Sequence, residues 1–289
     1  MPSDNLPMPA TRLTPAQEKS LVQIVRRAAR AEISPRFRKL TAGQISTKSG
    51  PQDIVTAADT GAEAMIARAI LRLFPNAVVL GEEAFAGDAS LRDTAAQAEL
   101  AFIVDPLDGT WNFAHGVPLF GIILAATRFG KPIFGLIYDP QTDDWMFASE
   151  DGHALQSEIG VPAKRLFTSD GGALETLSGF VHLSLMPQDE QEVLAPLLTA
   201  FDRTNALRCS AHEYRLMAAG AVDFVLSGTL NPWDHAAGVL ITRRAGGVSR
   251  FVDGRDYDIS VKDGHLLTAC DEDTWNAVRD TLAPALAET

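Results

Sequence analysis

The chain has 289 residues, and its 37 acidic side chains against 25 Lys and Arg give a formal net charge of −12 at pH 7. This balance disfavours nucleic-acid and anionic-membrane binding, because Lys and Arg supply most of the affinity for phosphate groups. With 46% apolar and 21% charged residues, the composition is typical of a soluble globular protein that buries roughly 75% of its unfolded surface without disulfides or a structural metal. The two cysteines, Cys209 and Cys270, form no CxxC pair, and we expect both to be reduced.

The first 13 residues are rich in Pro and polar groups and are expected to form a loose tail. They lack the charged start and continuous apolar stretch of a secretion signal, and no later segment holds about 18 uncharged apolar residues in a row. We therefore expect a cytoplasmic protein.

Two helices are predicted near the N-terminus. Thr14, Pro15 and Gln17 supply an N-cap, a first-turn proline and a capping-box partner for the first helix, which we expect to cover a sheet. The second is expected from about residue 59 to residue 74, and Pro75 should end it. Its inward stripe comprises Ala62, Ile66, Ala69, Ile70 and Leu73.

Short apolar runs at residues 77–80 and 101–104 end directly in acidic residues, which is how a strand delivers side chains to a site at its end. Residues 120–147 are predicted to form an antiparallel meander with a turn at residues 130–132. From about residue 175, strands alternate with helices near residues 190–200, near residues 212–219 and after Asp234. No linker is long enough to separate independent domains, so we expect one α+β unit over residues 1–289.

The strongest chemical signal is the segment Asp105-Pro106-Leu107-Asp108-Gly109-Thr110, directly after the apolar run AFIV. Its two carboxylates stand three residues apart, and the Leu107 carbonyl offers a further oxygen. Oxygen donors of this kind suit magnesium. Asp, Pro and Gly are also common in ordinary turns, so the segment by itself leaves a magnesium site and a plain turn both open.

Three weaker clusters accompany this segment. Gly81-Glu82-Glu83 follows another apolar run, and Asp234 begins an apolar helical stretch in PWDHAAG. The polar stretch before the second helix holds Lys48, Asp53, Thr56 and Asp59. Taken singly, the first cluster reads as a solvated turn, and Asp234 and Asp59 read as helix caps.

In combination, the segments TKSGPQDIVTAAD, LGEE, DPLDGTWNFAHG and PWDHAAG, the last followed by Ala245-Gly246-Gly247, resemble the inositol monophosphatase family of magnesium-dependent phosphatases. The matching segments run from about residue 44 to residue 247. The resemblance implies a layered αβαβα sandwich of the type shared with fructose-1,6-bisphosphatase. It also implies approximate subdomains at 14–175, with the metal and phosphate site, and at 176–289, on the substrate side.

The resemblance assigns metal ligands to five positions. Glu82, Asp105 and the Leu107 carbonyl would hold one magnesium, and Asp105, Asp108 and Asp234 would hold a second. A third, weaker magnesium would lie near Glu82. Two or three ions are therefore implied, and an acidic cluster is sensible only when they are bound.

The implied reaction is in-line attack of a metal-activated water on a phosphate monoester, without a phosphoenzyme. Glu82 and the Thr110 hydroxyl would orient or deprotonate the water, with Asp59 close to that part of the site. Backbone N–H groups of Gly109 and Thr110 would hold the phosphate at a helix start. Two neighbouring cations lower the pKa of the water and neutralise the leaving alkoxide. Lys48 either biases the electrostatics of a loop that closes over the site or is simply solvated.

The positions that contact the substrate match the family pattern less closely than the metal-ligand positions do. Inositol-specific members carry a glutamate seven residues before the Trp-Asp aspartate, where this chain has Ser227. The family's small-residue loop is replaced by residues 208–213, so Ser210, His212, Glu213 and Ser227 are candidate substrate contacts. Arg208, His212 and Glu213 either contact a polar or cationic substrate or form an exposed helix start. Inositol-1-phosphate, a small polyol phosphate, is the first choice.

Histidinol phosphate is the leading alternative, because Glu213 could meet an amine, and fructose 1,6-bisphosphate and adenosine 3′,5′-bisphosphate are others. A hypothesis of another class is a regulatory binding protein that retains the fold, against which the intact acidic positions argue. Family resemblance also implies a homodimer and inhibition by lithium. We expect a small phosphorylated metabolite as ligand, and neither nucleic acid nor membrane as partner.

Overall fold

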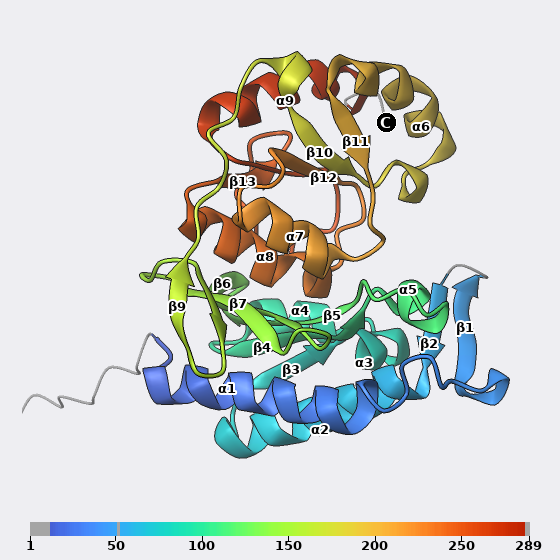
Figure 1. The fold of residues 1–289 in the computed structure, drawn as a ribbon, viewed down its shortest axis with the longest axis vertical. Coiled ribbons are helices and arrows are strands. Elements are labelled where there is room, and N and C mark those ends of the chain that lie inside the picture. Colours follow the sequence, from blue (N-terminus) through green and yellow to red (C-terminus); the bar gives the residue numbers. More distant parts are fainter. Residues whose placement is uncertain (1–11, 51–52, 287–289) are drawn as a thin grey trace, which may run out of the picture.

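The computed structural model describes residues 12–50 and 53–286, and the loose tail expected at the N-terminus lies, up to residue 11, outside the described residues. Five layers follow one another along the long axis in Figure 1: a helix pair, a large sheet, a second helix pair, a smaller sheet and an outer helical layer. This is the layered α+β sandwich that the sequence predicted. No helix in the described ranges has the length and apolar character that a membrane crossing requires.

The large sheet has seven strands in the order β3-β4-β5-β6-β7-β8-β9, and only its first pair, β3 and β4, is parallel. The meander predicted for residues 120–147 forms its centre, although the turn lies at Phe129–Gly130, because Pro132 already pairs with Thr127. The strands are β3 (Val78–Gly81), β4 (Ala101–Asp108), β5 (Gly121–Arg128), β6 (Lys131–Asp139), β7 (Asp144–Ser149), β8 (Leu155–Glu158) and β9 (Val161–Arg165).

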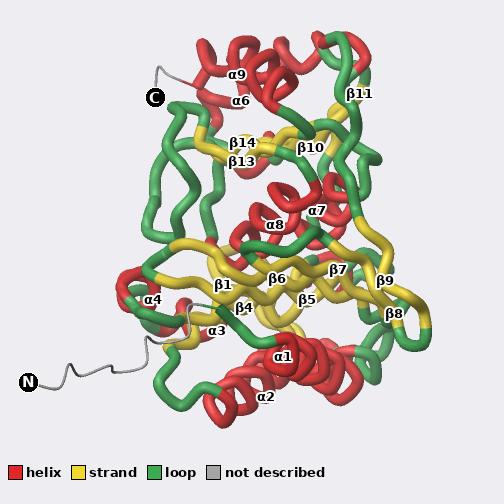
Figure 2. Tube along the Cα trace, turned by 90° about the vertical axis from the view of Figure 1, so that its left-hand side faces the viewer, coloured by secondary structure: helices red, strands yellow, loops and turns green. Residues whose placement is uncertain are grey.

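Helices α1 (Pro15–Ala28) and α2 (Ala57–Leu73) cover one face of this sheet (Figures 1 and 2). The capping box predicted for α1 is present, with the Gln17 N–H donating to Thr14. Helix α2 begins two residues earlier than expected, because Thr56 caps it. Its stripe is buried at Ala62, Ile66 and Ile70, but the expectation for Leu73 was wrong, since that side chain is 37% exposed at the helix end.

The smaller sheet has the order β11-β10-β12-β14-β13 and lies between the α7–α8 pair and the outer helices α6 and α9 (Figure 2). Its strands are β10 (Ser178–Val181), β11 (Arg203–Asn205), β12 (Phe224–Ser227), β13 (Val248–Phe251) and β14 (Leu266–Ala269). The helices are α6 (Gln188–Leu194), α7 (Ser210–Ala218), α8 (Pro232–Ala245) and α9 (Glu272–Leu286), and the shorter ones are α3 (Glu82–Gly87), α4 (Leu91–Gln97) and α5 (Thr110–Ala114).

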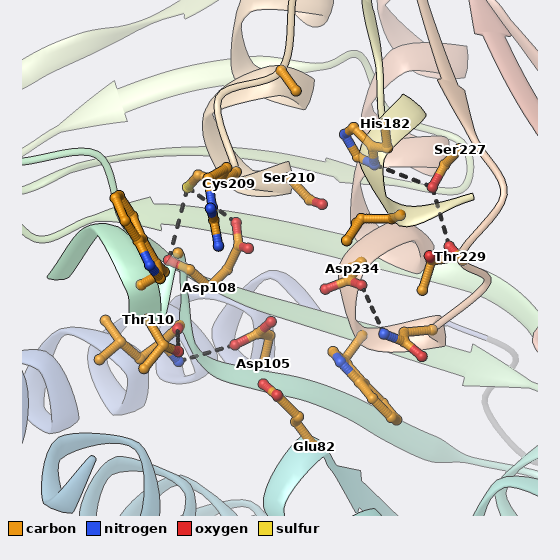
Figure 3. A pocket seen from close by; sticks show the side chains of 18 of the residues that line it. Glu82, Asp105, Asp108, Thr110, His182, Cys209, Ser210, Ser227, Thr229 and Asp234 are labelled. Carbon is orange, nitrogen blue, oxygen red and sulfur yellow. Dashed lines mark hydrogen bonds between the residues drawn. The ribbon is translucent and has the colours of Figure 1, made fainter. Parts of the chain in front are cut away.

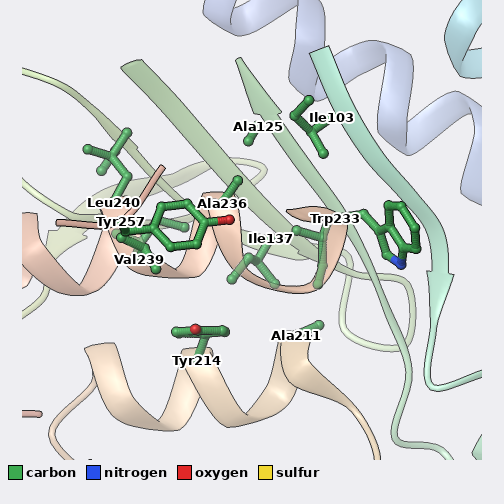
Figure 4. Close-up of a cluster of buried hydrophobic side chains, with 14 of the residues drawn as sticks. Ile103, Ala125, Ile137, Ala211, Tyr214, Trp233, Ala236, Val239, Leu240 and Tyr257 are labelled. Carbon is green, nitrogen blue, oxygen red and sulfur yellow. The ribbon is translucent and has the colours of Figure 1, made fainter. Parts of the chain in front are cut away.

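The middle helix layer joins the two halves of the chain. Figure 4 shows α8 beside strands of the large sheet, and its Trp233, Ala236 and Val239 belong to one buried cluster with Ile103 and Ile137. Burial of apolar surface is the dominant favourable term in folding. The halves therefore share a core, while the boundary expected at residues 175–176 stays a prediction.

Two hairpins were missing from the expected elements. Strands β1 (Ile45–Gly50) and β2 (Asp53–Thr56) pair within the polar stretch before α2, where too few apolar residues alternate to indicate strands. Strands β8 and β9 form the second hairpin. Strand β9 is exposed along its whole length, so its sequence also lacks the alternation of apolar and polar residues that indicates a strand. Lys48 falls on β1, and its side chain lies outside the described residues.

Close packing of α7 on α8 depends on Gly238. A Cβ atom there would lie 2.1 Å from Cγ of Tyr214, a fully packed ring on α7. We expect Gly238→Ala to lower the free energy of unfolding by about 2 kcal/mol in urea denaturation, because overpacking outweighs the better helix propensity of Ala. Gly87→Ala, whose Cβ would meet nothing within 4 Å, is the control. Equal stability of the two variants would contradict this packing role.

Candidate metal and phosphate site

Three acidic side chains from both halves of the chain meet in one place. Carboxylate oxygens of Asp105, Asp108 and Asp234 lie within 4.8 Å of one another. Figure 3 shows them in a cavity with Glu82 close by. Asp105 and Asp108 are buried at the end of β4, and Asp234 lies in the first turn of α8.

A bulge in β4 brings Asp105 and Asp108 to the same face. Asp105 pairs with Ile123 and Asp108 pairs with Gly121, so β4 uses three residues where β5 uses two. In a regular strand, residues three apart point to opposite faces, and one extra residue reverses this. The sequence predicted a turn after the strand, whereas the structure continues the strand through Asp108.

Glu82 reaches the same cavity from the neighbouring strand. Strand β3 runs parallel to β4, with Gly81 beside Val104, so the residues that follow, Glu82 and Asp105, lie at the same end of these two strands. Glu82 begins α3 and lines the cavity. The two acidic segments that follow apolar runs in the sequence are therefore neighbours in space.

Burial and neighbouring charges raise the pKa values of these carboxylates. Burial and the charges of Glu82, Asp108 and Asp234 hold the pKa of Asp105 well above its usual range. Burial and the Asp234 charge raise the pKa of Asp108 to about 7, and burial raises the pKa of Asp234 to about 6. Close carboxylates need protons or cations between them, and an all-oxygen set fits a hard divalent ion.

Thr110 connects this cluster to Asp59. Its hydroxyl oxygen lies 2.8 Å from Oδ1 of Asp59 and 2.9 Å from the Leu107 carbonyl oxygen. Asp59 is completely buried, and its other oxygen accepts the Thr56 N–H at 2.9 Å as part of the α2 capping box. Burial raises the pKa of Asp59 to about 6. Asp59 is therefore not the N-cap of α2 but the capping-box partner of Thr56, and it is also the hydrogen-bond partner of Thr110.

The backbone at Gly109 requires glycine. Its φ is +85°, and a Cβ would lie 2.7 Å from the Leu119 carbonyl oxygen and 3.2 Å from Sγ of Cys209. The tight turn starts α5 directly beside Asp108. The Asp108 carboxylate in turn accepts the Ala211 N–H at the start of α7, so this acidic residue ties the two halves together.

The substrate-side candidates divide into two pairs. Ser210 and Ser227 line the cavity, whose volume is about 470 Å³. His212 and Glu213 are absent from its described lining: Nε2 of His212 lies 3.2 Å from the Phe120 carbonyl oxygen, and Glu213 is completely buried. The prediction that Glu213 lies at an exposed helix start was wrong, because α7 turns that side chain into the interior.

Three more residues, His182, Arg208 and Trp111, line the cavity. His182 lines the cavity just beyond β10, and the Arg208 guanidinium lies 4.2 Å from the centroid of the Trp111 ring. His182 follows the short run SGFV, so the signal that identified the acidic residues, a polar side chain after an apolar strand, was also present here. Trp111 offers no such signal, because an aromatic residue after DPLDGT packs equally well in a core.

A layered α+β fold that brings three carboxylates, Glu82 and the turn at Gly109 into one cavity has a donor set that suits a metal-dependent phosphatase. The family model described as the inositol monophosphatase family matches residues 16–286. The chain therefore belongs to this family and is a phosphoric monoester hydrolase, which confirms the resemblance predicted from the sequence.

Similarity to individual proteins supports membership of this family. The inositol-1-monophosphatase of Mesorhizobium japonicum is 31% identical over 238 residues, which cover 81% of this chain and 85% of the relative. A Nus factor SuhB of Vibrio cholerae is 32% identical over 220 residues, covering 73% and 77%. The solved IMPase of Thermotoga maritima matches with a TM-score of 0.78 at 24% identity, covering 94% of this chain and 99% of that one. This structural similarity shows the fold.

The raised pKa values predict how metal removal affects stability. Folded-state carboxyls with raised pKa values bind protons that the unfolded chain has already lost, so their stabilising contribution disappears as pH rises through about 6 to 7. In EDTA, we expect the free energy of unfolding to fall by about 2–3 kcal/mol from pH 5 to pH 8. Excess magnesium should restore stability at pH 8.

Urea denaturation at both pH values, with EDTA or magnesium, measures this effect. Asp234→Asn should show a weaker pH dependence in EDTA, because it removes one titrating group and one repulsive neighbour of Asp108. A wild-type protein equally stable at both pH values in EDTA would contradict the mutual repulsion.

Proposed function

We propose that the protein hydrolyses a small polyol phosphate, with inositol-1-phosphate as the first choice, in a magnesium-dependent reaction. The observation that carries this proposal is the convergence of Asp105, Asp108 and Asp234 in one cavity, although more than a hundred residues separate Asp108 from Asp234. Glu82 extends the acidic wall on the β3 side.

The donor set suits two magnesium ions. Glu82, Asp105 and the Leu107 carbonyl would hold one, and Asp105, Asp108 and Asp234 would hold the other, while a third, weaker ion would lie near Glu82. When bound, such ions neutralise phosphate oxygens, activate water and stabilise a leaving alkoxide. The remaining steps belong to side chains and backbone groups of this chain.

Thr110 and Asp59 are placed to handle the proton of the attacking water. The Thr110 hydroxyl can donate to Oδ1 of Asp59 and accept from a water on the cavity side. Asp59, whose pKa is raised to about 6, can take up the proton through this hydroxyl at neutral pH. Glu82 faces the same region and would help to orient the water.

Backbone groups would bind the phosphate. Gly109 and Thr110 stand where the chain turns from β4 into α5, and their N–H groups point from a helix start, where anions are favoured. The φ of +85° at Gly109 is what allows this turn. Asp234, on the other side of Asp108 from Thr110 in Figure 3, would then face the leaving alcohol.

The alcohol would occupy the part of the cavity lined by Ser210 and Ser227. A cavity of about 470 Å³ has room for a polyol phosphate. The relatives named inositol-1-monophosphatase support this choice, and the relative of Thermotoga maritima named fructose-1,6-bisphosphatase/inositol-1-monophosphatase, 29% identical over 212 residues, supports the class of polyol phosphates.

Removing one carboxylate tests the metal role. We expect Asp105→Asn to lower magnesium-dependent phosphate release by about a thousandfold or more, because electrostatic stabilisation worth several kcal/mol is lost. Asp234→Asn should behave similarly. Asp280→Asn, an exposed carboxylate on α9, is the control and should retain wild-type activity. Full activity of Asp105→Asn with an intact fold would refute the proposed ligand set.

A second pair of variants tests the proton path. Thr110→Val removes the hydroxyl and keeps the shape, and we expect kcat to fall by about a hundredfold or more. Thr110→Ser keeps the hydroxyl and should stay within about tenfold of wild type. Steady-state kinetics at saturating magnesium measures both, and equal losses in Val and Ser variants would assign Thr110 a packing role instead.

A phosphate-release panel with inositol-1-phosphate, fructose 1,6-bisphosphate, adenosine 3′,5′-bisphosphate and histidinol phosphate tests the substrate choice. Preference for histidinol phosphate by orders of magnitude in kcat/KM would overturn it. A wild-type protein that releases no phosphate with magnesium would favour the regulatory binding protein. The homodimer, inhibition by lithium and the cytoplasmic location stay predictions.

A further inference from the structure

A buried histidine–glutamate pair supports the cavity wall beyond Asp234. His182 follows β10, Glu213 lies in α7, and Nε2 of His182 is hydrogen-bonded to Oε2 of Glu213. The second oxygen of Glu213 accepts the Leu207 N–H at 2.7 Å. Both oxygens of this completely buried carboxylate are therefore engaged, and Glu213 has no free oxygen or surface for a substrate amine.

The other ring nitrogen leads to the cavity. Nδ1 of His182 lies 3.2 Å from Oγ of Ser227, which lies 3.1 Å from the Thr229 carbonyl oxygen. The Ser227 hydroxyl has one proton, so when it donates to Thr229, the nitrogen of His182 must donate to Ser227. With both nitrogens donating, the ring is an imidazolium that balances the charge of Glu213.

Electrostatics agree with this assignment. Burial lowers the pKa of His182, but the charge and hydrogen bond of Glu213 outweigh burial, and the net shift is upward. A buried carboxylate is stable only when it is paired, and here the partner is the imidazolium. The pair therefore fixes the ring, and the ring in turn fixes the Ser227 hydroxyl.

The position of this chain of hydrogen bonds points to the leaving alcohol. His182, Ser227 and Thr229 line the same cavity as Asp234. In Figure 3 they lie beyond Asp234, on the side away from Thr110 and Glu82. If the water attacks from the side of Thr110, in-line displacement sends the alcohol toward Ser227.

We propose that His182 and Glu213 are positioning residues that hold the Ser227 hydroxyl for recognition of an uncharged hydroxyl group on the leaving alcohol. This inference rests on the proposed function and narrows its substrate class to polyol esters without an amine. The wall presents a substrate with the Ser227 hydroxyl, and the imidazolium behind it neutralises Glu213, so that carboxylate offers a substrate ammonium group no free negative charge. An exposed carboxylate at this position would instead favour a substrate that carries an ammonium group.

The test compares two leaving groups. Myo-inositol 1-phosphate carries hydroxyls, and p-nitrophenyl phosphate presents none. We expect Ser227→Ala and Glu213→Gln to lower kcat/KM for inositol 1-phosphate by about tenfold, the worth of one hydrogen bond to a well-held partner, and for p-nitrophenyl phosphate by less than about twofold. A purely structural role would lower both values by the same factor, and that result would overturn the inference.

The chain provides a matched control. Nε2 of His265 lies 2.8 Å from Oε2 of Glu190, a second histidine–glutamate pair in the same half and outside the described cavity lining. Glu190→Gln should leave the ratio of the two kcat/KM values unchanged. Ser227→Ala introduces no unpaired buried charge, so it keeps the test decisive if Glu213→Gln is unstable.

Two further outcomes separate this inference from the proposed function. Faster hydrolysis of histidinol phosphate than of inositol 1-phosphate by the wild-type enzyme would overturn the inference while leaving a magnesium-dependent phosphatase in place. Absence of magnesium-dependent release from either ester would refute the proposed function, and the inference would be refuted with it.

Discussion

Repulsion among buried carboxylates is the constraint on which the site depends. Asp105, Asp108 and Asp234 bring their oxygens within 4.8 Å of one another, in surroundings that raise the pKa of each. Folding such groups together is unfavourable unless protons or cations lie between them. In the protein without metal, repulsion between these carboxylates destabilises the folded state. A bound divalent cation removes this repulsion, so metal binding stabilises the fold.

The fold supplies the means of holding these groups together. A bulge turns both carboxylates of β4 to one face, and the parallel neighbour β3 ends beside them, so three acidic side chains come from one end of the sheet. Helix α8, packed on the same sheet, brings the fourth. The Ala211 N–H at the start of α7 holds Asp108, which links the position of that carboxylate to the second half of the chain.

The sequence predicted structure and site correctly where a short segment determines its own local conformation. The order of the acidic segments predicted the family, the layered fold and the convergence of Glu82, Asp105 and Asp234. It could not reveal the role of His182, because its partners, Glu213 and Ser227, are 31 and 45 residues away and meet it only through tertiary packing. For the same reason Glu213 appeared available for a substrate amine. The hairpin of β1 and β2 was missed because polar strands lack an apolar alternation.

Diffraction from crystals soaked in Mn²⁺, recorded at wavelengths where manganese scatters anomalously, tests whether the acidic cluster binds divalent cations. We expect anomalous peaks within coordination distance of carboxylate oxygens of Asp105, Asp108 and Asp234, with a further ligand from Glu82, and loss of the peak shared by the first three in Asp234→Asn crystals. Peaks confined to other parts of the molecule, or a fully ordered cluster without any metal at millimolar Mn²⁺, would contradict it.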